Sequence, residues 1–480
     1  MKNIIIIGAG LGGLSAACRL AKEGFAVTIL EKNATIGGKV NFVEAGGYKF
    51  DTGASLLTMR HVLEELFEFC GVKIEDYLEI VPLEPICRYF WSDGTRFDAS
   101  QNTEATEREI ERIAPADVEG FRKYLADSRQ KYEVAERTFL AKSLNDLPSL
   151  LTPRYLPDLL KISTLKTLDQ HNAAFFRSPK LRQLFNRFAT YNGSSPFRTP
   201  ATFALIPYVE FGLGAWYVRG GMYEIPRALE RLAIELGVRI FTESEVEEIV
   251  VENKQAVGVR VAGESIGADF VVSNMDAVET YRSLLPIKKF QNREPSCSGF
   301  VLLLGTRRRF ETLAHHNIFF SDDYRAEFDA LFKEKRPALA PTIYICATSR
   351  SDDSQAPAGH ENLFVLVNAP YTSGRTDWEK EKLPYRDLII RKLEDFGLKD
   401  LESVIDFERI ITPADFETKY RTNRGSIYGI SSNGIFSAFM RVPNRSREIE
   451  NLYFTGGATH PGGGIPLVLL SGKMVAEMIS

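Results

Sequence analysis

The 480-residue sequence predicts an α/β fold with a parallel sheet, interleaved with a second part of α+β type. Two observations predict the parallel sheet. Near each end of the chain, a glycine-rich turn joins a short apolar strand to a helix, at residues 8–13 and 456–464. A third observation, that this texture is interrupted at residues 76–213 and 291–424, predicts the interleaved second part. A chain of this length favours two such parts over one.

The first turn follows an isoleucine-rich strand expected at residues 3–7 and has the spacing G-x-G-x-x-G over residues 8–13. A helical pattern follows, and a second strand, expected at residues 26–30, ends at Glu31. Glycines at this spacing permit a tight turn and the close approach of a pyrophosphate, and the acidic residue accepts hydrogen bonds from a ribose diol. The first turn therefore predicts a dinucleotide-binding site.

The second turn follows an apolar strand expected at residues 452–454 and opens the last helix, in which Pro466 lies near the first position. A helix N-terminus behind a glycine turn brings backbone N–H groups close to a ligand and favours negative charge. Two such turns at opposite ends of the chain indicate one cofactor held between them.

A second double glycine, Gly37-Gly38-Lys39, follows Glu31 closely, which is typical of FAD enzymes. A second nucleotide unit is not expected, because Gly212-Leu-Gly214 lacks the third glycine. One FAD is therefore predicted, without a separate NADPH domain.

Composition narrows the class of protein further. The net charge is −4 and 25% of residues are charged, which gives no reason to expect nucleic acid as a partner. The five cysteines form no C-x-x-C motif, so we expect reduced thiols in a cytoplasmic protein. No signal peptide is expected, and glycines and prolines in the uncharged stretch 455–472 argue against a membrane span.

The pattern between the two ends indicates further elements. A helix is expected at residues 223–236 and ends before Gly237. Strands are expected at residues 238–241, 246–251, 256–261 and 269–273. The FAD-binding domain is expected to comprise residues 1–75, 214–290 and 425–480, and the substrate-binding, membrane-facing domain residues 76–213 and 291–424.

These motifs, together with Gly220-Gly221-Met222-Tyr223 and Thr459-His-Pro-Gly-Gly-Gly-Ile-Pro466, resemble the bacterial-type phytoene desaturases, which are FAD-dependent carotenoid desaturases. Residues 189–196 and Leu467 are most similar to the 1-hydroxycarotenoid and methoxyneurosporene 3,4-desaturase branch. The chain departs from the family at Ala54, where proline is frequent, and at Gly457-Ala458. Neither change removes a charge or a hydrogen-bond donor, so FAD binding is still expected.

The resemblance implies a Rossmann-like FAD-binding domain of the glutathione reductase/amine oxidase type and C–C dehydrogenation of an acyclic carotene. It also implies oxygen or a quinone as electron acceptor and peripheral association with the inner membrane. The cofactor-binding residues that we expect are Gly8, Ala9, Gly10, Gly12, Gly13, Glu31, Lys32, Gly38, Lys39, Val246, Gly456, Gly457, Gly464 and Ile465.

No catalytic base and no metal site are assigned. His460 is expected to hydrogen-bond the backbone, and Asp51 to tie the Gly37–Lys39 loop to the following turn. The adjacent His315 and His316 are expected in a surface loop, because no partner stands at metal-ligand spacing.

Two apolar stretches have two interpretations each. Residues 203–217 are apolar and aromatic, broken only by Glu210, and are expected to form either a polyene channel or ordinary core. Residues 155–168 combine leucines with neighbouring basic residues, which predicts either a membrane-interface helix or a core helix.

Other functions remain open at this point. A carotenoid isomerase, saturase or terminal-methyl oxidase of the same family would share these motifs. A flavin amine oxidase relative would share the N-terminal half but not the residues at 459–466. A binding module without activity would not need both glycine turns.

Overall fold

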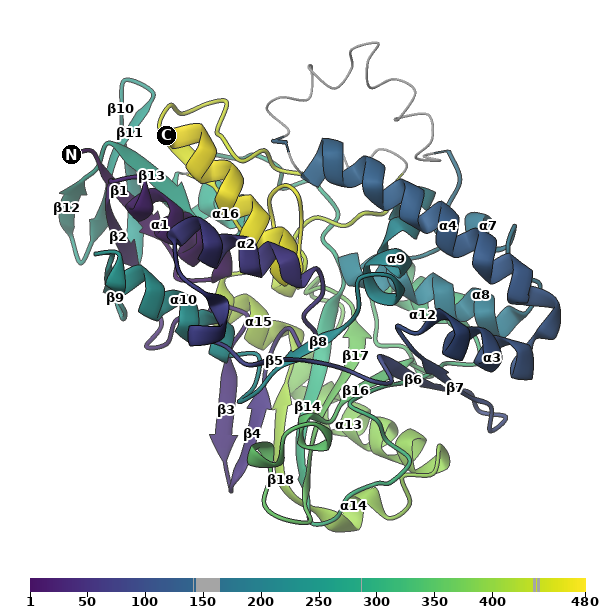
Figure 1. The fold of residues 1–480 in the computed structure, drawn as a ribbon. Coiled ribbons are helices and arrows are strands. Elements are labelled where there is room, and N and C mark those ends of the chain that lie inside the picture. The colour runs from purple at the N-terminus through teal and green to yellow at the C-terminus, as the bar shows by residue number, and fades with distance from the viewer. Residues whose placement is uncertain (141, 144–164, 286, 435–436, 438–440) are drawn as a thin grey trace.

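The computed structural model describes residues 1–140, 142–143, 165–285, 287–434, 437 and 441–480. Its first sheet is parallel throughout and has the strand order β19-β13-β1-β2-β9 (Figure 1). The strands are β1 (Asn3–Ile7), β2 (Ala26–Leu30), β9 (Arg239–Phe241), β13 (Phe270–Ser273) and β19 (Leu452–Phe454). In chain order the spatial sequence is 5-4-1-2-3, so the winding direction changes between β1 and β13, which is where open α/β sheets bind ligands. The predicted α/β class is thereby confirmed.

Four helices pack beside this sheet and contact one another. They are α1 (Leu11–Lys22), α2 (Arg60–Cys70), α10 (Glu224–Glu235) and α16 (Ile465–Ile479). Helix α1 contacts the other three, and Figure 1 shows α16, in yellow, beside α1 and α2. The close approach of α1 and α16 requires Gly472, because a Cβ there would lie 2.7 Å from the carbonyl oxygen of Gly12. The two ends of the chain are therefore packed together.

A small antiparallel sheet, of order β10-β11-β12, lies beside the first sheet. Its strands are β10 (Val246–Glu252), β11 (Gln255–Val261) and β12 (Glu264–Gly267). The first two agree with the sequence prediction within a residue. Strand β12 was missed, since all four of its residues are exposed and give no hydrophobic pattern.

The second large sheet has seven strands in the order β18-β14-β17-β16-β15-β6-β7. They are β6 (Cys87–Phe90), β7 (Arg96–Ala99), β14 (Ser298–Thr306), β15 (His316–Phe319), β16 (Ile343–Cys346), β17 (Glu361–Ala369) and β18 (Ile405–Ile411). All pairs are antiparallel except β15 with β6. Helix α13 (Trp378–Asp395) packs on this sheet through Trp378, Tyr385 and Ile389.

A helical layer lies beyond β6 and β7 in Figure 1. It contains α3 (Thr103–Ile113), α4 (Val118–Ala135), α7 (Leu168–Asn172), α8 (Pro179–Asn186), α9 (Ile206–Phe211) and α12 (Tyr324–Asp329). Aromatic rings fill its centre: the ring of Tyr124 lies 4.7 Å from that of Phe185, which stacks at 4.5 Å on Phe176. This layer therefore has a well-packed core.

Short elements connect the large parts. The hairpin of β3 (Phe42–Ala45) and β4 (Tyr48–Asp51) and the pair of β5 (Ile80–Pro82) with β8 (Trp216–Val218) form two-stranded sheets. Within the described ranges, the remaining α-helices are α11 (Ala277–Glu279), α14 (Leu401–Val404) and α15 (Pro413–Tyr420).

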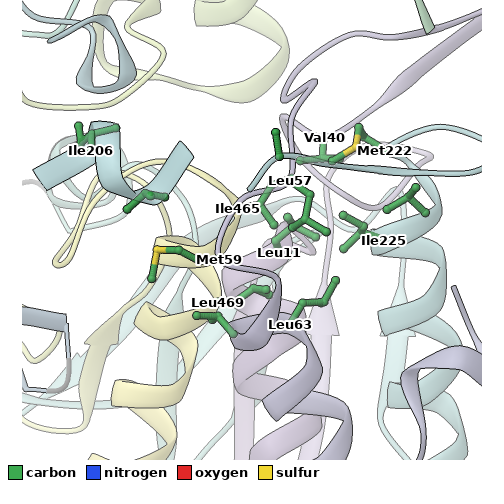
Figure 2. Close-up of a cluster of buried hydrophobic side chains, with 14 of the residues drawn as sticks. Leu11, Val40, Leu57, Met59, Leu63, Ile206, Met222, Ile225, Ile465 and Leu469 are labelled. Atoms are coloured by element: carbon green, nitrogen blue, oxygen red, sulfur yellow. The ribbon is translucent and has the colours of Figure 1, made fainter. Parts of the chain in front are cut away.

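One hydrophobic cluster runs through the junction between these parts. Figure 2 shows Leu11 and Leu469, from α1 and α16, near Leu57, Met59 and Ile465. All five are buried, and the same cluster continues into the helical layer through Ile206. The two ends of the chain and the helical layer thus share a continuous core.

The division into two discontinuous domains stays a prediction. The parallel sheet and the β10–β12 sheet are drawn from the ranges expected for FAD binding, and the seven-stranded sheet from the other ranges. The β5–β8 pair joins one strand from each set. Among the helices that the structure describes, none is long and apolar enough to cross a bilayer.

Candidate functional site

A cavity of about 990 Å³ opens at the carboxyl ends of the parallel strands. The residues directly after four of these strands line it: Gly8 after β1, Glu31 after β2, Asn274 after β13 and Thr455 after β19. From there the same cavity continues between the seven-stranded sheet and the helical layer, where Ile206 is one of the residues that line it. One space therefore joins both predicted glycine turns to an apolar interior.

The N-terminal turn is built around Asn274. A Cβ on Gly10 would lie 2.5 Å from Asn274 Nδ2, and one on Gly12 would lie 2.7 Å from Asn274 Oδ1. Gly456, from the C-terminal turn, has φ +103° and would place a Cβ 2.9 Å from the same Oδ1. Both turns therefore close on one amide side chain, which the sequence analysis did not identify.

Glu31 is buried at the end of β2 and is oriented by the first turn. Its Oε2 accepts a hydrogen bond from the backbone N–H of Ala9 at 2.8 Å, and its Oε1 accepts one from the N–H of Asn33 at 2.9 Å. The backbone N–H of Gly37 donates to the carbonyl of Ala9 at 2.8 Å, which brings the second double glycine onto the first turn. These contacts hold the carboxylate at the cavity wall.

The C-terminal turn presents an open helix start. Gly464 precedes α16, has φ +104° and has no atom within 4 Å of its Cβ position, and no side chain caps the helix. The buried Oγ1 of Thr455 has no hydrogen-bond partner among the described residues. Gly464 and Thr455 both line the cavity. The open backbone at the start of α16 suits an anionic ligand, and the Thr455 hydroxyl, which lies beside Gly12 of α1, offers a further polar contact at the cavity wall.

Two basic side chains, the partly buried Lys39 and the buried Arg441, also line the cavity. Lys39 donates from Nζ to the carbonyl of Ile427 at 2.5 Å, and burial lowers its pKa to about 8 although Asp276 lies nearby. Arg441 donates to the carbonyl of Gly457 at 3.3 Å and forms no ion pair with any described carboxylate; burial lowers its pKa to about 10. Arg441 was not predicted from the sequence, because nothing local marks it as buried.

Eleven of the fourteen predicted cofactor-binding residues line the cavity: Gly8, Gly10, Glu31, Lys32, Gly38, Lys39, Val246, Gly456, Gly457, Gly464 and Ile465. The other three, Ala9, Gly12 and Gly13, lie behind the wall. Gly13 is required there because a Cβ would lie 2.4 Å from the carbonyl oxygen of Gly8. Binding of a cofactor by these residues stays a prediction.

His460 lies in the cavity wall and bonds the backbone as expected. Its Nε2 lies 2.8 Å from the carbonyl oxygen of Phe139 and 2.9 Å from that of Lys142. The buried Nδ1 has no partner among the described residues, and burial lowers the pKa of the ring to about 4. The ring is therefore neutral at physiological pH, with Nε2 as donor.

The sequence analysis expected Asp51 to tie the Gly37–Lys39 loop to the following turn, but in the structure it bonds elsewhere. Its carboxylate accepts the backbone N–H groups of Met222 at 2.9 Å and Tyr223 at 3.1 Å, at the start of α10. The prediction was wrong because the β3–β4 hairpin points Asp51 towards the Gly220–Gly221 turn, where a Cβ on Gly221 would lie 3.2 Å from the carboxylate.

His315 and His316 are buried, so their prediction as surface loop was wrong. His316 begins β15, an interior strand of the seven-stranded sheet, and His315 directly precedes it. Their Nδ1 atoms bond the hydroxyl oxygens of Ser351 and Tyr344 at 2.8 Å, and one ligand atom from each histidine and from Cys346 lie within 4.8 Å of one another. Burial lowers the pKa of His315 to about 3.

The apolar part of the cavity is formed by the predicted aromatic run and by the sheet. Phe203, Leu205, Ile206 and Val209 line it, so part of this run is cavity wall, and its use as a polyene channel stays a prediction. The one charge in the run, Glu210, also lines the cavity and pairs with Arg187 at 2.7 Å. The pair was not predicted, because its partners lie 23 residues apart on different elements.

These residues fit FAD. The first turn has the glycines that a pyrophosphate requires, and Glu31 is oriented for a ribose diol. Lys39 and Arg441 are cations at the cavity wall that bond no carboxylate in the part of the chain that the structure describes. The open start of α16 adds a positive dipole end for an anionic ring.

Comparison with known families agrees with this geometry. Residues 11–480 match the family of flavin containing amine oxidoreductases. A solved structure of cyclohexylamine oxidase from Brevibacterium oxydans is similar, with a TM-score of 0.63 at 15% identity over 100% of this chain and 99% of that one. At this identity the likeness shows the shared fold.

Two curated proteins are similar over the full length. A 4,4'-diapolycopene oxygenase from a Methylomonas species is 41% identical over 100% of this chain and 98% of its own. A 1-hydroxycarotenoid 3,4-desaturase from Flavobacterium sp. (strain P99-3) is 42% identical over 100% of this chain and 99% of its own.

Proposed function

The chain belongs to the flavin-containing amine oxidoreductase family and is an FAD-dependent oxidoreductase, and on this premise we propose that it desaturates an acyclic carotenoid. The observation that carries the proposal is the single cavity. It joins the glycine turns of residues 8–13 and 456–464 to an apolar interior formed by the seven-stranded sheet and by α9. A polyene in that interior would lie against the cofactor's site.

The side chains at the junction fit this reaction. A bound flavin supplies the hydride acceptor, so the protein has to orient the chain and receive one proton. The reaction needs no strong acid or base at this junction, where neutral His460 and the apolar Ile206 line the cavity. We assign no catalytic base.

A second candidate is oxidation of a terminal methyl group. It is supported by the similarity to the 4,4'-diapolycopene oxygenase, at an identity equal within one per cent to that of the 3,4-desaturase. Both named reactions lie near the end of a polyene, so the two candidates share a substrate class and differ in product. An isomerase or saturase of the same family is a further alternative.

Product mass separates these candidates. Flavin-loaded protein would be offered phytoene, neurosporene, lycopene and a 1-hydroxylated acyclic carotene, with oxygen or a quinone as acceptor. Desaturation lowers the mass by two hydrogens per step and moves the absorption to longer wavelength, whereas methyl oxidation adds oxygen. Unchanged mass with altered geometry would indicate an isomerase. Four unchanged substrates would count against the carotenoid proposal as a whole.

We also propose peripheral association with the cytoplasmic face of the inner membrane, since an acyclic carotene is a membrane solute. The predicted interface helix at residues 155–168 lies largely outside the described residues, so the proposal is supported by its sequence pattern alone. Replacing Leu159 and Leu160 by Asp should weaken flotation with anionic liposomes at unchanged FAD content. Equal flotation would mean that this segment does not contact the membrane.

A further inference from the structure

The apolar part of the cavity contains a buried ion pair. Nη2 of Arg187 donates to both carboxylate oxygens of Glu210, at 2.7 and 2.9 Å, and the two side chains are 9% and 1% exposed. The hydroxyl of Tyr191 donates to Glu210 Oε2. Tyr89 accepts from Arg187 Nε at 3.0 Å and from Nη2 at 2.6 Å. Three of these residues, Arg187, Tyr191 and Glu210, line the cavity.

Stability does not explain this pair. Removing two charges from water costs about as much as their attraction returns, and apolar residues of similar volume are often as stable or better. The neighbours of Glu210 in α9, Val209 and Phe211, are apolar, as a polyene channel requires. A hydrocarbon chain forms no hydrogen bond with a charge pair in that wall, whereas a polar group on the ligand can.

The pair also has unused hydrogen-bonding capacity. Nε and Nη2 of Arg187 bond Tyr89 and Glu210, and the guanidinium also interacts with the Tyr191 hydroxyl, whereas Nη1 forms no hydrogen bond of good geometry with a described residue. The guanidinium is held in place by rings, with its carbon 4.4 Å from the centre of Phe188 and 5.5 Å from that of Tyr191. The result is a fixed donor beside a fixed carboxylate, both at the cavity wall.

We propose that Arg187, Tyr191 and Glu210 form a subsite that binds a hydroxyl group at the end of an acyclic polyene. A hydroxyl oxygen accepts from Arg187 Nη1, and its O–H donates to the Glu210 carboxylate, so one group satisfies both partners. A hydrocarbon end would leave Nη1 of Arg187 and the remaining acceptor capacity of Glu210 unmet and would displace water from them, which disfavours its binding. This inference rests on the proposed function.

Relative turnover of two substrates tests the subsite. The substrates are a 1-hydroxylated acyclic carotene and the hydrocarbon of the same chain length and unsaturation. A single bond to a charged group corresponds to a preference of about tenfold to a hundredfold, so we expect kcat/KM of the wild type to favour the hydroxylated substrate by that factor. Arg187→Met with Glu210→Met removes both charges together and should abolish the preference, through loss of the hydroxylated substrate's advantage.

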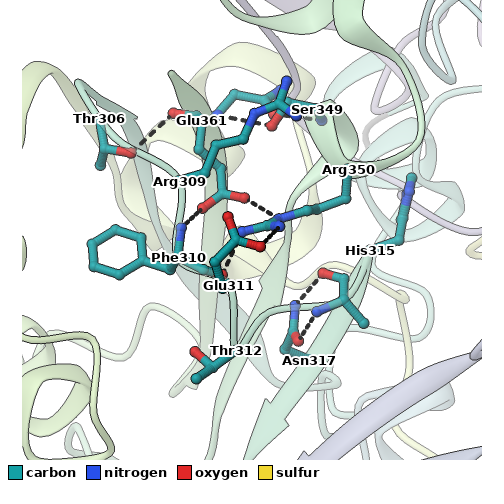
Figure 3. Close-up of polar contacts among 12 residues, drawn as sticks. Thr306, Arg309, Phe310, Glu311, Thr312, His315, Asn317, Ser349, Arg350 and Glu361 are labelled. Carbon is teal, nitrogen blue, oxygen red and sulfur yellow. Dashed lines mark hydrogen bonds and ion pairs between the residues drawn. The ribbon is translucent and has the colours of Figure 1, made fainter. Parts of the chain in front are cut away.

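A matched control comes from a second buried ion pair. Figure 3 shows Arg350 bonded to Glu361, whose side chains are 15% and 0% exposed, and neither residue lines the cavity. Arg350→Met with Glu361→Met should leave the preference unchanged. Tyr191→Phe keeps the ion pair and removes only the hydroxyl that orients the Glu210 carboxylate, so it should reduce the preference several-fold.

Each outcome decides the inference. A wild-type preference that Tyr191→Phe reduces, and that the double variant abolishes while the control keeps it, supports the subsite. Equal kcat/KM for both substrates in the wild type, or an unchanged preference in folded Arg187 and Glu210 variants, overturns it while leaving the proposed function standing. If the wild type converts neither substrate nor any other carotenoid, the proposed function fails and the subsite with it. Retention of the hydroxylated carotenoid by the protein, measured by its absorbance after gel filtration in detergent, gives a readout independent of turnover.

Discussion

The carboxylate of Asp51 accepts a hydrogen bond from the backbone N–H of Met222 at 2.9 Å, which fixes the end of β4 to the start of α10. Residues on both sides of this contact matter to the site: Thr52 and Gly53 line the cavity, and α10 packs on α1 behind the first glycine turn. Asp51 is buried, and burial raises its pKa to about 7 against the two backbone hydrogen bonds.

This shift predicts the pH dependence of an Asp51→Asn variant. Between pH 4 and 7 the folded wild type holds a proton that the unfolded chain releases, so its stability falls as pH rises through this window. The amide does not titrate. The free energy of unfolding of the variant should therefore rise relative to that of the wild type up to pH 7, by about 4 kcal/mol at most. Thermal unfolding of both proteins from pH 4.5 to 8 measures this. A difference independent of pH would mean that Asp51 is ionised throughout.

Gly10→Val should abolish flavin binding. Its Cβ would lie 2.5 Å from Asn274 Nδ2, so the amide between the two glycine turns must move, and the side chain would also enter the cavity. We expect purified variant protein to lack the yellow colour and the flavin released by heat. Gly267→Val is the matched control, because only one atom lies within 4 Å of its Cβ position, at 3.9 Å. A flavin-replete Gly10→Val protein would place the cofactor elsewhere.

The sequence predicted those parts of the site that depend on local spacing. The strand, turn and helix of residues 3–22, the acid at Glu31 and the helix after Gly464 are contiguous patterns, and the structure has them within a residue or two. Asn274 could not be found in this way, because only the pairing of β13 with β1 brings it between the turns.

The same reason explains the misplaced histidines and the missed ion pair. His316 is buried because β16 and β6 flank β15, and the sheet order that achieves this joins segments more than 200 residues apart. Glu210 was noticed only as an interruption of an apolar run. Its partner Arg187 belongs to another element, and no periodicity relates the two.

Lys39→Met should stabilise the flavin-free protein and weaken flavin binding. Burial lowers the pKa of Lys39 to about 8, so keeping it charged at pH 7 costs about 3 kcal/mol, of which the bond to Ile427 offsets about 1. We expect the free energy of unfolding of the variant to exceed that of the wild type by about 2 kcal/mol at pH 7. This difference should shrink as pH rises from 8 to 10.5, because Lys39 in the folded wild type loses its charge there. Urea unfolding and flavin titration measure the two effects. Lys380→Met, at a side chain that is 83% exposed, should change neither.

His460→Gln should make the protein less sensitive to acid. Burial lowers the pKa of His460 to about 4, so between pH 6.5 and 4 the unfolded chain binds a proton that the folded wild type does not. Wild-type stability therefore falls as pH falls through this window, by up to about 3 kcal/mol relative to the variant. The glutamine amide can still donate to the carbonyls of Phe139 and Lys142, so flavin content should be kept.

The measurement and the effect on turnover complete this test. Unfolding of His460→Gln and of the wild type, followed from pH 4 to 7, measures this divergence. Because the imidazole is already neutral and is held by the backbone, we expect His460→Gln to retain substantial carotenoid turnover. Complete loss of turnover in a variant with full flavin content would show instead that the unpaired Nδ1 of His460 takes part in the reaction, since the glutamine keeps the donor but lacks that basic nitrogen.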